Sequence, residues 1–198
     1  MKYLKNIVLI LIIVGGIYYQ WSHSIWVRDN PDGALRSQPV QSESALPSSF
    51  THKDYTIIPK AYFNIKARVL SRKRYFLGRE TDLVPVDLAL GWGVMSDFKV
   101  LKELKISQSN RWYFYRYSEP PILKSEIASH SANMHLIPAD KEVAKAIQSV
   151  RKGEIVSFKG YLVNVSAKDG WHWNSSLSRT DTGAHACELV WVKEFQVE

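Results

Sequence analysis

Histidines form the first group of residues that could do chemistry. His130 and His135 lie within a polar stretch, 129–136, that is bounded by apolar segments. A spacing of four would place both imidazoles on one helical face for a metal, but a spacing of five does not. Ser131 and Asn133 are suited to hydrogen bonds with nearby backbone. The stretch therefore favours a structural turn over a metal site, and no metal or cofactor is expected.

A second group, 171–188, is the densest collection of reactive side chains and contains Cys187, the single cysteine. A cysteine nucleophile needs a base within hydrogen-bonding reach, and His172 or His185 would have to supply it. His185 and Cys187 are two residues apart, which places them on one face of a strand without bringing them together. The alternative is that Cys187 is a small buried hydrophobic residue.

Arg179 and Asp181 complete the polar candidates of this region. They are typical of an ion pair that closes a loop, and a substrate clamp is the alternative. The candidates for catalysis are His130, His135, His172, Arg179, Asp181 and Cys187.

Aromatic and basic residues interleave over 111–117, and a tryptophan pair follows at 171–173. Aromatic faces beside guanidinium groups bind sugars or bases, although a core also requires large aromatic side chains. Alternation along a strand places one set inside and the other outside, so we expect exposed tyrosines here. The candidates for ligand binding are Arg111, Tyr113, Tyr115, Trp171 and Trp173.

The elements that must position these residues follow from periodicity. Alternation predicts strands over 63–69 and 111–117, and 140–152 has the apolar spacing of a helix that begins at Asp140. Weaker signals predict a helix from Ser96 to Leu104 and a segment opened by Pro121 that continues to Met134.

The remaining strands are expected after the helix, in the last third of the chain. Strands are predicted over 154–158, 161–166, 171–177 and 187–197, with a tight turn at 168–170. Gly160 falls inside a strand pattern, which indicates a bulge or bend. The fold class is therefore α+β and mostly β, either an OB-like small barrel or a bent sheet packed as a sandwich, with one well-defined helix.

The N-terminus predicts a membrane address. Lys2 and Lys5 precede an apolar run, 7–19, and tyrosines and tryptophans follow it. This layout is typical of a signal-anchor, and counting 6–26 as inserted gives an adequate transmembrane helix. A cleaved signal peptide is the alternative, because the strictly apolar run is short. We expect a single-pass inner-membrane protein whose N-terminus is cytoplasmic and whose domain is periplasmic or extracellular.

Composition divides the chain into three parts. Residues 1–28 form the anchor, 29–54 are a Pro- and Ser-rich stretch expected to be a flexible linker, and 55–198 form one globular domain. Beyond residue 26 there are 24 basic and 19 acidic residues, a mild excess that suits an anionic surface. The compartment makes nucleic acid an improbable partner, and one cysteine excludes an internal disulfide.

Four segments carry a resemblance to known proteins. They are 84–93, 107–113, 130–139 and 175–187. Over roughly 62–190 the chain resembles a family of bacterial membrane-anchored proteins with no assigned activity. The resemblance implies a bacterial origin and no mechanism.

Two classes of function remain. The first is a non-catalytic binding module of the bacterial envelope that presents aromatic and basic residues to a protein or glycan partner. The second is an envelope hydrolase or transferase in which the histidine, arginine, aspartate and cysteine candidates share one cleft.

Overall fold

One long, bent strand organises the domain. The computed structural model describes residues 2–23, 35–178 and 186–198. β3 (Tyr55–Arg74) pairs antiparallel with β8 (Ile155–Ala167) over its first part and with β4 (Val86–Gly91) over its last part. Side chains at alternate positions of β3 are buried, as the predicted strand 63–69 requires. β3 therefore belongs to both halves of the sheet.

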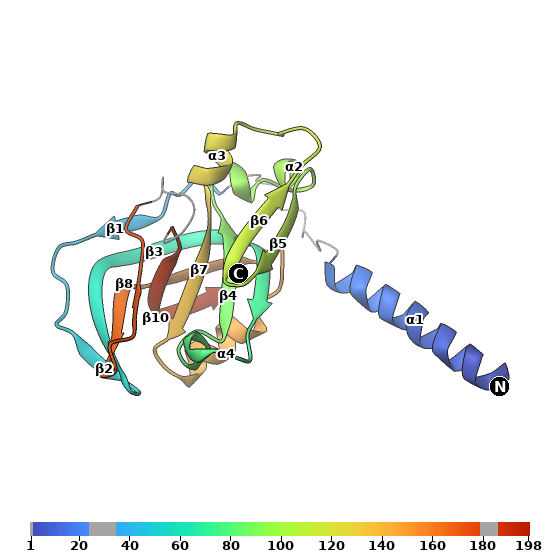
Figure 1. The fold of residues 1–198 in the computed structure, drawn as a ribbon. Helices are drawn as coiled ribbons and strands as arrows, with labels where there is room; N and C mark the ends of the chain where they lie inside the picture. The colour runs from blue at the N-terminus through green and yellow to red at the C-terminus, as the bar shows by residue number, and fades with distance from the viewer. Residues whose placement is uncertain (1, 24–34, 179–185) are drawn as a thin grey trace.

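The strand pairings return to β3 and form a ring. β4 pairs with β7 (Ser131–Pro138), β7 pairs parallel with β10 (Glu188–Val197), and β10 pairs antiparallel with β8 (Figure 1). The closure is uneven, since β8 follows β3 from Tyr55 to Arg68 whereas β7 meets β10 only from Met134 to Pro138. The fold is thus α+β and mostly β, with a strongly bent sheet and few helices.

β4 and β7 are strands that the sequence pattern did not predict. All six residues of β4 are buried, and so are most of those of β7. A strand buried on both faces lacks the alternation by which strands are recognised. Met134 consequently lies in β7 and not in the segment expected after Pro121, where the helix α3 is confined to Lys124–Ser129.

α4 (Lys141–Ser149) is the predicted helix, slightly shortened. The Asp140 side chain accepts a hydrogen bond from the Val143 amide at 2.8 Å, which caps the helix as expected. The backbone turns extended at Val150, so the helix ends before the predicted Lys152. Val143, Ile147 and Val150 pack against the apolar interior of the ring.

The helix predicted from Ser96 is much shorter than expected. α2 covers only Phe98–Leu101, after a 3-10 turn, η2 (Val94–Ser96). Its cap is Asp97, which accepts from the Lys99 amide at 2.8 Å. Ser96 instead donates to the Gly93 carbonyl and accepts from the Leu35 amide.

β5 (Lys105–Ser109) and β6 (Trp112–Arg116) form a separate hairpin, called here the β5–β6 hairpin. It agrees with the predicted strand 111–117. Asn110 and Arg111 form the two-residue turn, with φ of 51° and 66°. Its inward side chains Ile106, Tyr113 and Tyr115 pack on a cluster that includes Ala89 of β4. The hairpin therefore lies over the outer face of the ring (Figure 1).

β8 joins the two strands predicted over 154–158 and 161–166, with Gly160 inside it. A Cβ at Gly160 would lie 1.8 Å from the Trp191 carbonyl oxygen, so close backbone approach explains the glycine. The register of β10 shifts beside this point, between Val192 and Glu194. The next strand, β9, covers only His172–Asn174 and follows a turn in which Gly170 has φ of 87°.

The prediction of a flexible linker over 29–54 is wrong for residues 35–54, which belong to the folded domain. β1 (Val40–Ser42) and β2 (Phe50–His52) both pair with β3. Leu35 bridges to Gly93, and Gln38 accepts a hydrogen bond from the buried Trp92 indole at 2.9 Å. The domain therefore begins near residue 35, twenty residues before the predicted boundary.

The N-terminal helix α1 covers Lys2–His23, and the apolar side chains of 7–14 are exposed. Among the described ranges, no helix is both long enough and apolar enough to cross a membrane. The predicted inserted region, 6–26, ends in residues outside these ranges.

Candidate functional site

A buried polar network lies between the β5–β6 hairpin and the outer face of β4 and β7. We call it the Arg111 network, and its members are Asp87, Gln108, Arg111, Asn133 and His135. Arg111 occupies the hairpin turn in the left-handed region, which costs a non-glycine residue energy. Its guanidinium donates to the Asp87 carboxylate and the Val84 carbonyl, both at 2.8 Å, and to Thr81 Oγ1 at 3.2 Å. Three hydrogen bonds of the guanidinium therefore offset this strain.

Asp87 is the anion of the network, and its side chain is fully buried. It projects from β4 opposite His135 of β7, whose Nδ1 lies 3.0 Å from Asp87 Oδ1. That pair is within ion-pair distance, but the ring is not aligned for a hydrogen bond. Among the described residues, Asp87 Oδ2 and His135 Nδ1 have no hydrogen-bond partner. A buried carboxylate is costly unless it is paired, and Arg111 supplies that pair.

Amides connect the turn to the sheet. Asn133 of β7 donates to the Arg111 carbonyl at 3.0 Å, and Gln108 of β5 donates to Asn133 Oδ1 at 2.6 Å. The Cys187 sulfur lies 3.9 Å from the same Arg111 carbonyl. Residues from β4, β5 and β7 and the residue that precedes β10 thus meet around the hairpin turn.

Two aromatic rings cover the guanidinium. Arg111 Cζ lies 3.8 Å from the Tyr75 ring centre and 5.8 Å from that of Trp173. Tyr75 also accepts a hydrogen bond from the Arg111 amide at 3.0 Å. Burial raises the pKa of Tyr75, and the nearby Asp87 carboxylate raises it further. The arrangement keeps the phenol neutral and the ion pair shielded from water.

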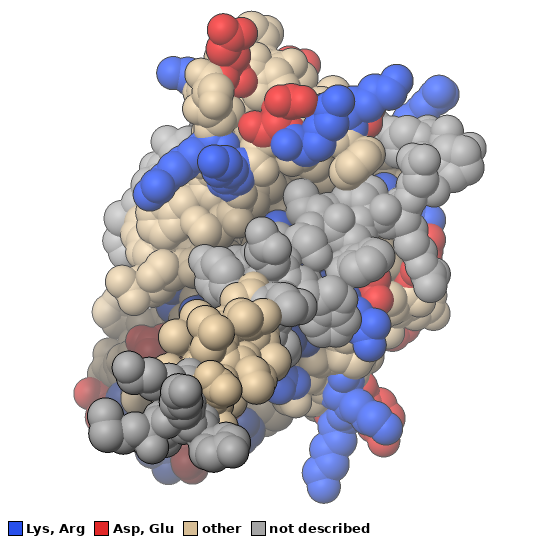
Figure 2. Space-filling model, turned by 90° about the vertical axis from the view of Figure 1, so that its right-hand side faces the viewer, with Lys and Arg blue, Asp and Glu red and all other residues tan. Residues whose placement is uncertain are grey.

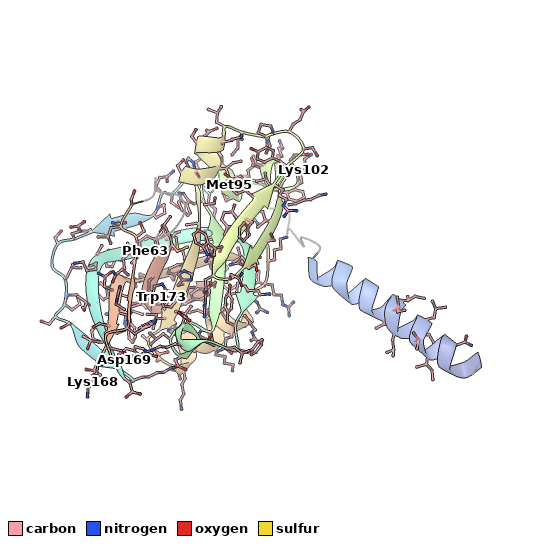
Figure 3. The ribbon with its side chains drawn as sticks, viewed as in Figure 1. Phe63, Met95, Lys102, Lys168, Asp169 and Trp173 are labelled. Carbon is pink, nitrogen blue, oxygen red and sulfur yellow. The ribbon has the colours of Figure 1, made fainter. Side chains whose placement is uncertain are left out.

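Three of the described candidates, His130, His172 and Trp171, are not brought to this network. His130 ends α3, where Nδ1 lies 3.0 Å from the Glu126 carbonyl, and its ring packs on Gly93. His172 is exposed on β9. Trp171, which was predicted to bind a ligand, packs against Tyr55 and under the Arg79 guanidinium. Figure 3 shows Trp173 at the middle of the molecule.

Arg179 and Asp181 lie outside the described residues. Within the described ranges, no group of three or more histidine, cysteine, aspartate or glutamate side chains could hold a metal ion.

The exposed side of the β5–β6 hairpin is a second candidate site. We define the hairpin face as Lys105, Ser107, Ser109, Trp112, Phe114 and Arg116, which are all exposed. Trp112 and Phe114 have 39% and 47% of their surface exposed to solvent, which is a large fraction for aromatic residues on a strand. Lys105 lies directly opposite Arg116, so two like charges face each other across the hairpin.

The tyrosines predicted as ligand-binding residues lie on the other side of the hairpin. Tyr113 and Tyr115 point toward the apolar cluster beneath it, and burial raises the pKa of Tyr113. The alternation expected over 111–117 is present, but the exposed set is Trp112 and Phe114.

Sequence reasoning missed Asp87, Asn133 and Tyr75 as partners of Arg111, and it missed Gln108 as the partner of Asn133. One signal was present, because Asp87 is the only charged residue in the apolar run 84–90. A charge inside such a run requires a buried partner.

Comparisons of this chain with protein-family models, with curated proteins and with solved structures find no match.

Proposed function

We propose that this protein is a non-catalytic binding module of the bacterial envelope, held at the inner membrane by its N-terminal segment. The single observation that carries the proposal is the hairpin face, on which Trp112 and Phe114 are exposed on the same side of the hairpin as the Lys105 and Arg116 pair. Exposed aromatic side chains beside basic groups provide stacking area and charge for a partner. Because like charges opposite each other destabilise a hairpin, an anionic partner fits this face.

The distribution of reactive groups supports binding over catalysis. Arg111 is paired with Asp87, Asn133 donates to the Arg111 carbonyl, and His130 and His172 lie elsewhere. A catalytic site needs groups that converge on a reacting atom, whereas these groups fasten the hairpin to the sheet.

An OB-like topology agrees with this proposal. In order along the chain, the ring has three antiparallel-linked strands, the helix α4 and two further strands, with a parallel β7–β10 pair. OB-folds bind ligands on the face of their second and third strands. Here the corresponding strands are β4 and β7, and the β5–β6 hairpin covers their outer face. We infer that binding has moved to the exposed side of that hairpin.

The membrane attachment is also part of the proposal. The exposed apolar side chains of 7–14 follow Lys2 and Lys5, which suits an anchor with a cytoplasmic N-terminus. The domain would then lie in the periplasm or outside the cell, where an envelope protein or glycan is the partner.

Site-specific photo-crosslinking in intact cells tests the binding face. A benzoylphenylalanine in place of Phe114 should give a discrete cross-linked product, and the same group in place of Phe98, an exposed residue of α2, should not. The double variant Lys105→Glu, Arg116→Glu should abolish the product. Equal products at both positions would contradict the proposed face.

An enzyme is the second candidate, and a specific observation favours it. Asp87 and His135 form a buried acid–histidine pair in the network that Cys187 also reaches. If His135 activates Cys187, alkylation of the thiol should proceed well below pH 8.5 and slow in His135→Gln. Slow alkylation that is equal in both proteins would remove this candidate.

A further inference from the structure

The loop that follows β3 carries the most exposed large apolar side chains of the described domain. We call residues 73–79, which comprise the last two residues of β3, the connection 75–78 and Arg79 at the start of a 3-10 turn, the tip loop. Phe76 and Leu77 in it are 81% and 90% exposed. Removing a Phe or Leu side chain from water is strongly favourable. A loop that holds both side chains in water is therefore suited to inserting them into an apolar environment that a partner supplies.

The tip loop is held in place from several directions. The Tyr75 amide donates to the Pro85 carbonyl at 3.0 Å, and Thr81 Oγ1 donates to the Leu77 carbonyl at 2.9 Å. Arg79 makes a two-pronged ion pair with Asp169, at 2.5 and 3.0 Å. The exposure of the apolar pair is therefore built into the loop.

A basic hollow of about 430 Å³ adjoins the tip loop at Arg74. It is lined by Arg74, Lys141, Ala144, Lys145, Gln148 and Ser149. Arg74 also donates to the Gln148 carbonyl at 3.2 Å, which fixes this side of the hollow. Its lining contains three cations and no acidic residue, so an anionic group fits it.

We propose that the tip loop and the basic hollow together dock on an anionic phospholipid bilayer, with a headgroup phosphate in the hollow and Phe76 and Leu77 among the acyl chains. Arg74 belongs to the tip loop and also lines the basic hollow, so the exposed apolar pair and the cations lie side by side. A ligand that is both apolar and anionic, such as a phospholipid, fits this combination. Two side chains on a convex tip offer far less area than a specific protein interface needs, which disfavours a protein partner.

The chain can reach its own membrane in this orientation. Leu35, where the domain begins, bonds to Gly93 and Ser96 beyond the end of β4, whereas the tip loop lies at the other end of β4. Figure 3 shows these two ends, marked by Met95 and by Asp169, the partner of Arg79. The six residues of β4 span about 20 Å, and the eight residues 27–34, which follow the predicted inserted region, can extend to about 26 Å. This reach rests on the membrane attachment proposed above.

Figure 2 shows the basic side chains of this side of the molecule in several separate groups. A fluorescent label near one group therefore reports whether that group meets the bilayer. Leu123, which is 69% exposed beside α3, is a matched control for Leu77 because it lies at the Leu35 end. We would place an environment-sensitive fluorophore at Leu77→Cys or Leu123→Cys, in the full chain with Cys187→Ser, and incorporate each protein into lipid nanodiscs.

The expected result is a blue shift of the label at 77 in phosphatidylglycerol discs, absent in phosphatidylcholine discs and absent at 123. Lys141→Glu, Lys145→Glu should weaken this docking at least about tenfold, and Lys99→Glu, Lys102→Glu should leave it unchanged. The inference would be overturned by a shift only at 123 or by an equal shift in both lipids. It would also be overturned by a shift without lipid that grows with protein concentration, which would indicate a second copy of the chain as the occupant. Failure of the chain to enter discs would instead refute the membrane attachment.

Discussion

At the scale of single residues, Arg111 decides how the candidate site is built. It combines an unfavourable backbone conformation with an ion pair to a fully buried carboxylate. Removing one member of such a pair leaves the other charged and unpaired in a low-dielectric site. The large effect of Arg111 should therefore be on stability, exerted through Asp87.

We expect Arg111→Ala to lower the free energy of unfolding by about 3 kcal/mol. Arg116→Ala, which removes an exposed arginine from the same hairpin, should change it by less than about 0.5 kcal/mol. Urea denaturation of the three proteins measures both values. Equal stability of the two variants would show that the Arg111 network does not fasten the hairpin.

Tyr113 gives the domain a pH dependence on the alkaline side. Burial raises the pKa of Tyr113 in the folded state above the value of about 10 in an unfolded chain. The stability contributed by the neutral phenol is therefore fully present below about pH 10 and is lost as the pH rises toward the folded pKa. Urea midpoints should fall less between pH 9 and pH 11 in Tyr113→Phe than in wild type or in the control Tyr117→Phe.

At the scale of elements, the close contact of β8 with β10 sets the curvature of the ring. Gly160 permits the Trp191 carbonyl to approach, and the register of β10 shifts immediately afterwards. A side chain at this position would meet backbone, which cannot move aside without parting the two strands.

Gly160→Ala should destabilise the domain by about 3 kcal/mol, because the added methyl collides with the Trp191 carbonyl. Gly170→Ala is the control. No atom lies within 4 Å of its added methyl, and only its φ of 87° is unfavourable, at about 1 kcal/mol. Thermal unfolding followed by circular dichroism ranks them, and the opposite order would contradict this account.

At the scale of the whole molecule, residues 35–54 belong to the domain and not to a tether. They add β1 and β2 to β3, and Gln38 accepts the hydrogen bond of the buried Trp92 indole. Leu35, the first described residue of this stretch, lies beside Gly93 and Ser96.

Truncation separates the two domain boundaries. Residues 35–198 should unfold in urea with the free energy of the full domain, whereas residues 55–198 should lose about 2 kcal/mol or more. The loss follows from the unpaired Trp92 indole and the missing strand pairs. Tryptophan fluorescence reports the transition, and equal midpoints would restore the boundary expected from sequence.

The sequence by itself determined the elements that bury one face. Alternation identified β3 and β6, and apolar spacing identified α4 with its Asp140 cap. Gly160 was predicted at a bulge or bend, and the structure places it at a close approach of two backbones. In each of these elements, burial on one side leaves a periodic record in the chain. The mostly β composition of the fold followed from the same record.

Only the tertiary structure decided the site. β4 and β7 are buried on both faces and lack periodicity, so the strands that carry Asp87 and His135 were missed. The ion pair of Asp87 with Arg111, a residue more than twenty positions away in the sequence, depends on how the hairpin folds back over the sheet. Which side of an alternating hairpin faces water likewise depends on what lies beneath it, and here the tyrosines cover an apolar cluster that residues far apart in sequence assemble.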